Sequence, residues 1–296
     1  MGRNSHGIPD KTFDIINNFL VFIITLIVVY PFVFVVSASI SDPMAVSTGK
    51  MWLWPVDITF NGYRKVFAND NIWIGYRNTI FYTLLGTAMH LAVLLPMSYA
   101  LSRKGVMGKK FIQWFVLFTM MFSGGLIPTY LVVKNLGMLN TVWSVTIPGL
   151  VGAWSILVTK SFFEANVPEE LVEVARIDGA SDFLIFRKIA LPLSKPIIAV
   201  MGLFHGVSMW NQYFKAMIYL SDRKKYPLQL FLREILVINQ VTEEAGGVIE
   251  SLMEQVKTAA QIKYAVIIVS SLPLLLIYPF VQKYFVQGTL IGSIKE

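Results

Sequence analysis

The chain has 296 residues, of which 55% are hydrophobic and only 15% are charged. Soluble domains carry about 25% charged residues, and a soluble fold of this size has too little interior to bury so much apolar surface. We therefore expect lipid to solvate part of the molecule. The absence of cysteine excludes disulfides, thiolate metal sites and thiol catalysis. The net charge of +7 could indicate a nucleic acid or an anionic membrane surface as partner. In so apolar a chain it is more typical of basic loops on the cytoplasmic side of a membrane, so we expect no nucleic-acid partner.

Six stretches are long and apolar enough to cross a bilayer, which takes roughly 20 residues in a helix. None of the six contains a charged residue: 19–36, 78–101, 111–133, 135–159, 196–214 and 264–282. We predict an all-α membrane protein with six transmembrane helices. The first stretch could instead be a signal peptide, because Arg3 and Lys11 precede it. Its apolar core is longer than the 7–15 residues usual for that role, which favours a retained helix.

The short loops between the predicted spans set the orientation, because basic residues are retained in the cytoplasm. The loop 102–110 contains four basic residues and no acid, whereas the loop after the third span contains only Lys134. We therefore expect the loop 102–110, the segment 160–195 and both termini in the cytoplasm. The basic residues of the outer segment 215–263 oppose this orientation, but long loops count little in the rule.

The sequence carries no catalytic or nucleotide-binding signature: it lacks a GxxxxGK[ST] loop, an HExxH motif and a GxSxG elbow. His6, His90 and His205 are far apart in the sequence. The latter two lie in predicted spans, where a histidine is more typical of packing or interhelical hydrogen bonding than of metal binding. Most acids lie in loops, so no proton relay through the spans is visible. Energy for uphill transport would therefore come from another subunit.

The segment between the fourth and fifth spans has the pattern of two short helices joined by a glycine turn. Pro168 and the two glutamates after it suit the start of a helix. Gly179 stands where a left-handed C-terminal cap is needed, and Ser181 can cap a second helix. One face of the first helix would carry Leu171, Val174, Ala175 and Asp178. Composition alone fits a connector on lipid headgroups and a docking surface equally well.

This segment resembles the EAA loop of ABC importer permeases, whose pattern is E-A-A, three residues, G, nine residues, I, one residue, L-P. The matching residues are Glu173, Val174, Ala175, Gly179, Ile189, Leu191 and Pro192. Every spacing agrees, and the only departure is Val174, where the family usually has alanine. The match also lies before the penultimate predicted span, as it does in the family.

Other stretches resemble the carbohydrate-uptake members of this family. They are 127–131 with 134–141, the W-N-x-[FY]-F stretch 210–214, and, for a subgroup that takes up complex or polysaccharide-derived saccharides, 122–125 and 278–288.

The resemblance implies a permease subunit of a maltose-type, binding-protein-dependent importer in the bacterial cytoplasmic (inner) membrane. Its type I fold would be a five-helix core plus an N-terminal helix and a cytoplasmic coupling helix. The implied partners are a second homologous permease, two ABC ATPases and an extracytoplasmic solute-binding protein. The chain would be no enzyme and hold no cofactor, because the ATPases bind ATP and Mg. The cargo would be an oligosaccharide or polysaccharide-derived sugar.

The resemblance also suggests domains and roles. The parts would be 1–75 (tail, first helix and outer loop), 76–290 (the permease domain, with its EAA loop at 164–194) and 291–296 (C-terminal tail). The residues that couple to the ATPase would be Glu173, Ala175, Asp178, Gly179, Ile189, Leu191 and Pro192. Trp210, Asn211 and Tyr213 are candidates for the substrate pathway. Alternatively, these three form the aromatic belt at the outer interface.

Three other functions stay open at this stage. The same machinery could carry peptides or amino acids, with the same loop and different pathway side chains. An ion-coupled secondary carrier would need acids within the spans and no ATPase. A membrane-embedded enzyme would need a nucleophile or a metal site.

Overall fold

The computed structural model describes residues 8–244 and 262–277 together with 279 and 282, and every regular element in these ranges is a helix. The chain divides into two compact units. One comprises residues 1–69 and 234–271, and the other comprises 70–233 and 272–296.

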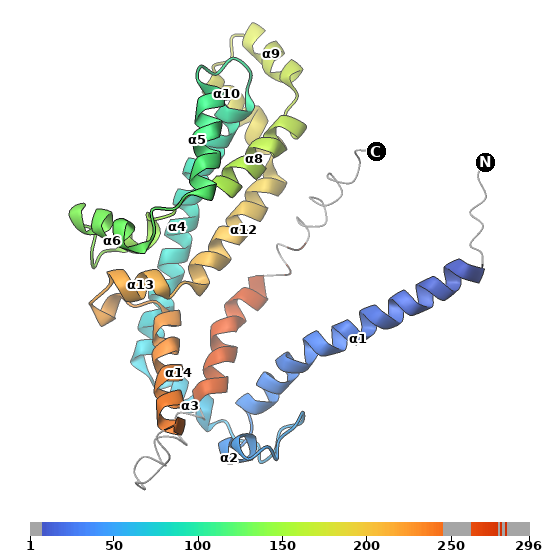
Figure 1. Ribbon diagram of the computed structural model, residues 1–296, viewed down its shortest axis with the longest axis vertical. Helices are drawn as coiled ribbons and strands as arrows, with labels where there is room; N and C mark the ends of the chain where they lie inside the picture. The colour runs from blue at the N-terminus through green and yellow to red at the C-terminus, as the bar shows by residue number, and fades with distance from the viewer. Residues whose placement is uncertain (1–7, 245–261, 278, 280–281, 283–296) are drawn as a thin grey trace. The chain divides into compact units, whose positions relative to one another are not determined.

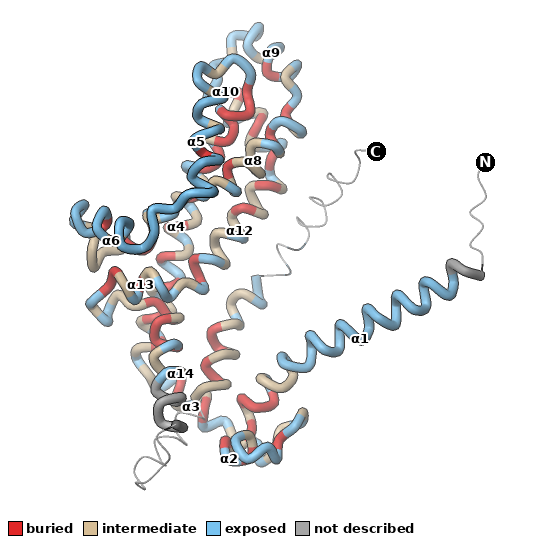
Figure 2. Tube along the Cα trace, viewed as in Figure 1, coloured by how far each residue is buried: buried red, intermediate tan, exposed pale blue. Residues whose placement is uncertain are grey.

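The first unit begins with the long helix α1 (Ile8–Ser39), which leads into the short helices α2 (Pro43–Ser47) and α3 (Asn61–Phe67). The side chain of Asp42 caps α2 by accepting hydrogen bonds from two backbone amides. Most of α1 is apolar and exposed (Figure 2). A surface of this kind is stable in lipid or against another apolar helix, because water would not solvate it.

The second unit is built on α4 (Asp70–Ser102), which packs against α8 (Ala153–Asn166) and α12 (Lys195–Asn211) (Figure 1). Leu94 and Met201 are buried where these helices meet. The remaining elements of this unit are α5 (Lys109–Met121), α6 (Leu126–Asn135), α7 (Val142–Thr146), α9 (Glu169–Ile177), α10 (Asp182–Ile185), η1 (Phe186–Ala190), α11 (Leu191–Leu193), α13 (Phe214–Tyr219) and η2 (Arg223–Lys225). The helix α14 (Leu228–Glu244) begins in this unit, and its residues from 234 onward are assigned to the first.

The prediction of an all-α membrane protein is confirmed, while the number of six spans stays a prediction. Among the described residues, two helices are long and apolar enough to cross a bilayer: Lys11–Ser39 and Asp70–Ser102. The pair α5 and α6 would make a third, although its two halves are bent by 116°. A shorter apolar helix covers Ile262–Ile277, and part of the predicted sixth span lies outside the described residues.

Two predicted spans are not continuous helices, which corrects the sequence analysis. The stretch 111–133 breaks between α5 and α6, where Gly125 has a φ of 81° that interrupts the helix. The stretch 135–159 breaks between α7 and α8 around Gly149, whose φ is 68°. Hydropathy measures the side chains and not the backbone, so it does not reveal such breaks. Broken backbone at membrane depth must be covered by protein or line a water-filled cavity.

Candidate functional site

The segment with the EAA pattern folds as two short helices around a glycine turn, as predicted. Gly179 has a φ of 80° and follows α9. The turn is closed by a hydrogen bond of 2.9 Å from the Ala180 amide to the Ala175 carbonyl. The Ser181 hydroxyl caps α10 by accepting from the Leu184 amide at 3.3 Å. The left-handed glycine and the serine cap are both confirmed.

The helix continues after α10 through the π-helical turn η1 into α11. Phe186 in this turn packs on Tyr99 of α4, with ring centroids 5.2 Å apart. Ile189 and Leu191 are half-buried and pack against a core formed by Leu95, Tyr99, Phe163, Val167, Val172, Ile185 and Ala190. This core attaches the EAA segment to α4 and α8.

The structure shows which side of α9 is buried, a point on which the sequence analysis made no prediction. Val172 is completely buried and Ala175 is half-buried against the core, so these two residues mark the inner face. Leu171 and Val174, which the helical spacing grouped with Ala175, are exposed by 46% and 57%. Apolar residues occur on both sides of α9, so their spacing could not indicate which side the core covers.

The outer surface of the segment is apolar with acidic residues around it. Ile177 is 86% exposed and Phe183 is 71% exposed, and Leu171 and Val174 are exposed as well. Glu173, Asp178, Gly179 and Pro192 are also exposed. Exposed apolar residues clustered on a short helix are typical of a protein interaction site.

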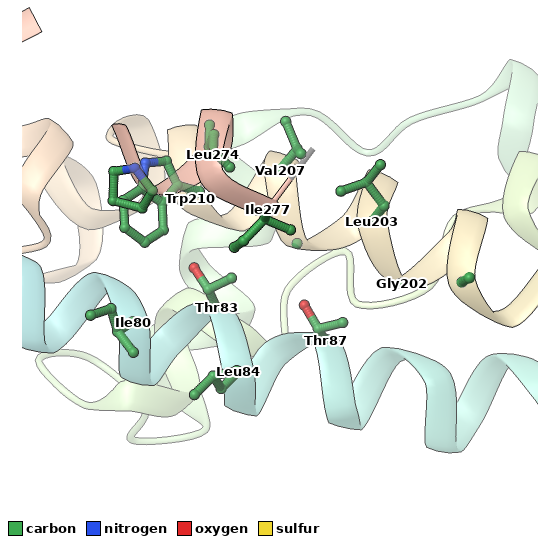
Figure 3. A pocket seen from close by; sticks show the side chains of 13 residues that line it. Ile80, Thr83, Leu84, Thr87, Gly202, Leu203, Val207, Trp210, Leu274 and Ile277 are labelled. Atoms are coloured by element: carbon green, nitrogen blue, oxygen red, sulfur yellow. The ribbon is translucent and has the colours of Figure 1, made fainter. Parts of the chain in front are cut away.

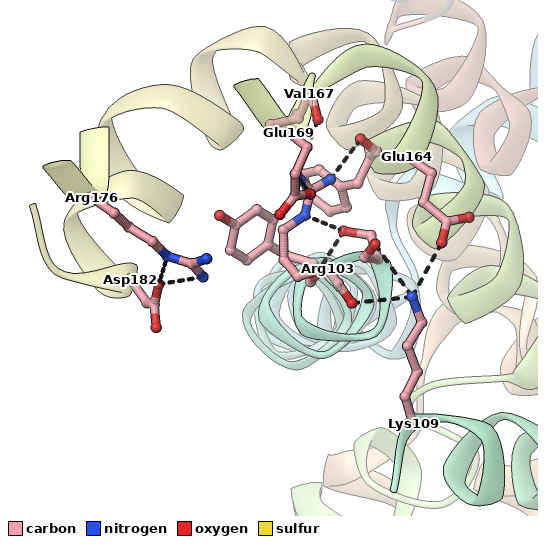
Figure 4. Close-up of polar contacts among 10 residues, drawn as sticks. Arg103, Lys109, Glu164, Val167, Glu169, Arg176 and Asp182 are labelled. Carbon is pink, nitrogen blue, oxygen red and sulfur yellow. Dashed lines mark hydrogen bonds and ion pairs between the residues drawn. The ribbon is translucent and has the colours of Figure 1, made fainter. Parts of the chain in front are cut away.

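Arg103 connects the end of α4 to the junction of α8 and α9 (Figure 4). Its guanidinium donates to the carbonyls of Phe163 and Val167 at 3.1 and 3.0 Å, and to the Glu169 carboxylate at 3.3 Å. It also lies over the Tyr99 ring, 5.2 Å from the centroid. The residue is 5% exposed. The sequence analysis used Arg103 only as a charge that sets the orientation, because these three partners lie 60 to 66 positions away.

Further ion pairs join the same two segments. Lys109 lies 3.5 Å from Glu164, which also pairs with Lys160 at 2.8 Å. On the exposed tip, Arg176 pairs with Asp182 at 3.0 Å. Hydrogen bonding to this carboxylate, together with its charge, raises the pKa of the Arg176 guanidinium. Exposed pairs stabilise little, so the buried Arg103 is the stronger connection. The contacts put the loop 102–110 and the EAA segment on the same side of the spans.

The three pathway candidates have different surroundings. Trp210 is buried and lines an apolar pocket of about 490 Å³, on whose walls Thr83 and Thr87 also lie (Figure 3). Asn211 is exposed, and its amide donates to the Val207 carbonyl at 3.0 Å. Tyr213 is 41% exposed, and the guanidinium of Arg233 in α14 lies over its ring. Within the described residues, no group of three or more possible ligands could hold a metal ion.

Comparisons with known proteins agree along nearly the whole chain. The family described as "Binding-protein-dependent transport system inner membrane component" matches residues 1–291. The polygalacturonan/rhamnogalacturonan transport system permease protein YtcP of Bacillus subtilis is 39% identical over 97% of this chain and 99% of its own length. Protein LplC of the same organism is 37% identical over 96% of this chain and 95% of its own.

A solved structure is also similar. It is a chain of a bacterial ABC transporter involved in the import of the acidic polysaccharide alginate, with 34% identity and a TM-score of 0.84. The similarity covers 96% of this chain and 100% of that one.

Proposed function

The chain belongs to the family of binding-protein-dependent transport system inner membrane components, and we propose that its cargo is an oligosaccharide derived from a polysaccharide. It is a multi-pass permease of an ABC importer, and it is not itself catalytic. Such a permease implies ATPases, a binding protein and a second permease. The observation that carries the cargo proposal is the 39% identity, over nearly the full length of both chains, to a permease named for polygalacturonan and rhamnogalacturonan.

We further propose that the outer face of α9 and α10 docks on a partner ATPase. Its exposed apolar residues Leu171, Val174, Ile177 and Phe183 would be buried by such a contact. Glu173 and Asp178 lie among them as polar contacts. The left-handed turn at Gly179 would fit closely against the partner. Ala175, Ile189 and Leu191 would fix the segment on its own core, whereas Pro192 is exposed and would lie on the docking side.

The mechanism we propose is a rigid-body movement. When the ATPases close on ATP, the docked segment moves, and the core beneath α9 together with Arg103 carries the movement into α4 and α8. A connection of this kind works only if the ATPase contact favours one of two permease conformations over the other.

The topology that fits this proposal has six spans, with both termini in the cytoplasm. Residues 1–75 would hold the N-terminal helix and outer loop, 76–290 the permease domain, and 291–296 a tail. Trp210, Asn211 and Tyr213 at the end of α12 remain candidates for the pathway. The exposure of the last two favours this role.

The test is transport by the complete importer in proteoliposomes. Glu173→Lys and Gly179→Val should each lower sugar uptake by about tenfold or more. Either the ATPase no longer binds, or its ATP hydrolysis is no longer coupled to uptake. Gly105→Val is the matched control, because Gly105 also has a positive φ in open space but lies outside the EAA segment. Parent-level uptake in both variants, with the ATPase still bound, would make the segment a simple connector.

The same assay examines the cargo. Stimulation of ATP hydrolysis by a binding protein loaded with oligogalacturonate supports the sugar proposal. Stimulation by a peptide-loaded binding protein alone would favour the peptide alternative. The family assignment leaves no support for an ion-coupled carrier or a membrane enzyme.

A further inference from the structure

Two pockets of the second unit meet at the break between α7 and α8. One of about 190 Å³ lies between this break, α4 and α12. The other, of about 310 Å³, lies between the break, α6 and α13. Gly149 lines both pockets. Because the break interrupts a predicted span, its non-helical backbone needs protein cover or water. Pockets with polar lining residues at this position are suited to hold water or a polar ligand.

Side-chain nitrogens bind two backbone carbonyls of the break. The Lys215 ammonium donates to the Pro148 carbonyl at 2.6 Å. Nδ1 of His90 lies 2.6 Å from the Leu150 carbonyl oxygen, so this nitrogen carries the proton. These contacts satisfy carbonyls that a continuous helix would have paired internally.

His205 adds a third nitrogen-bearing group. Its ring stacks on that of His90, with centroids 4.1 Å apart and planes 6° from parallel. His205 Nε2 is buried and has no hydrogen-bond partner within the described part of the chain. A buried polar atom of this kind costs free energy unless a ligand or water satisfies it.

Among the described residues that line these two pockets, the charged one is basic. Lys215 lines the larger pocket, and none of the described residues lining either pocket is acidic. Within the described ranges no carboxylate lies at ion-pair distance from Lys215, although its ammonium can donate two more hydrogen bonds. Serine and threonine hydroxyls (Ser155, Ser208 and Thr129) complete the polar surface. A half-buried cation without an anion is suited to a negatively charged ligand.

We propose that these two pockets form one binding site for the carboxylate of an acidic saccharide on its way through the permease. Lys215 pairs with the carboxylate, and His205 and the hydroxyls bind the sugar ring. This inference rests on the proposed function and specifies the cargo as an oligosaccharide of uronic acids. The competing interpretation is that Lys215 and His90 serve only to cap the carbonyls of the break.

The experiment measures uptake of trigalacturonate by the complete importer in proteoliposomes, after co-purification has shown that each complex assembles. Lys215→Gln retains a donor for Pro148 and removes the charge, whereas Lys215→Arg retains the charge. We expect Lys215→Gln to lower the uptake rate at low sugar concentration about tenfold, and Lys215→Arg to stay within about threefold of the parent. Lys134→Gln, at an exposed lysine of α6 outside both pockets, should leave the rate unchanged.

Several results would overturn the inference. One is parent-level uptake by Lys215→Gln, and another is an equal loss in Lys215→Gln and Lys215→Arg. A third is that Lys215→Gln lowers the uptake of methyl-esterified trigalacturonate as much as that of trigalacturonate, because the ester keeps the sugar rings without the charge. If the complex with Lys215→Gln does not assemble, the test uses His205→Gln instead. We expect His205→Gln to lower the uptake rate of trigalacturonate about threefold, and an unchanged uptake rate would refute the site. A parent importer that carries only neutral saccharides refutes this inference alone, whereas one that carries no saccharide refutes the proposed function.

Discussion

Arg103 connects the end of α4 to the start of α9, so Arg103→Ala should weaken the attachment of that helix. The side chain makes four hydrogen bonds, to Ser102 Oγ, to the carbonyls of Phe163 and Val167, and to Glu169. Hydrogen bonds to a charged group each contribute about 1.5–3 kcal/mol, and breaking a buried ion pair costs about 3–5 kcal/mol. Water can enter at this end of α4 after truncation, so we expect the lower limit, about 3 kcal/mol.

The measurement is hydrogen exchange of the backbone amides of 167–178 in the purified importer. A loss of about 3 kcal/mol in the free energy of local opening lowers protection roughly 100-fold. Arg103→Lys should lose about half of that free energy, because an ammonium cannot reproduce the planar fork. Lys104→Ala, at the exposed neighbouring position, should change nothing. Unchanged protection in Arg103→Ala would refute the reasoning, since α9 would then be held by its apolar core alone.

Two further predictions concern close packing and topology. A Cβ at Gly75 would lie 2.8 Å from Leu228 Cα, so Gly75→Ala should cost about 1–3 kcal/mol. It should also raise hydrogen exchange at the Leu228 amide, which donates to the Thr79 hydroxyl at 2.8 Å. The control is Gly206→Ala, whose Cβ would lie 3.5 Å from its nearest atom. Equal loss of stability in the two variants would contradict the packing argument. A Gly105→Cys variant should not be labelled by an impermeant thiol reagent in intact cells but should be labelled in inverted vesicles. Labelling in intact cells would show that the orientation is the opposite of the proposed one.

The sequence determined the features that arise from neighbouring residues. Uncharged apolar runs identify a membrane protein, because the cost of placing charge in lipid acts on every residue of a span. Gly179 and Ser181 indicated the turn and the second helix of the EAA segment, because a left-handed cap and an N-cap are local requirements. The spacing of the EAA residues then gave the family, which the comparisons confirm.

Tertiary structure alone decided which residues meet. Hydropathy did not reveal the breaks at Gly125 and Gly149, because it measures side chains, whereas a break depends on the protein or water that pairs with the freed backbone groups. The buried face of α9 depended on Val172 meeting a core contributed by distant helices. His90 and His205 are far apart in the sequence, yet their rings stack between α4 and α12. A contact between residues far apart in the chain depends on how the helices pack, and no local pattern encodes that packing.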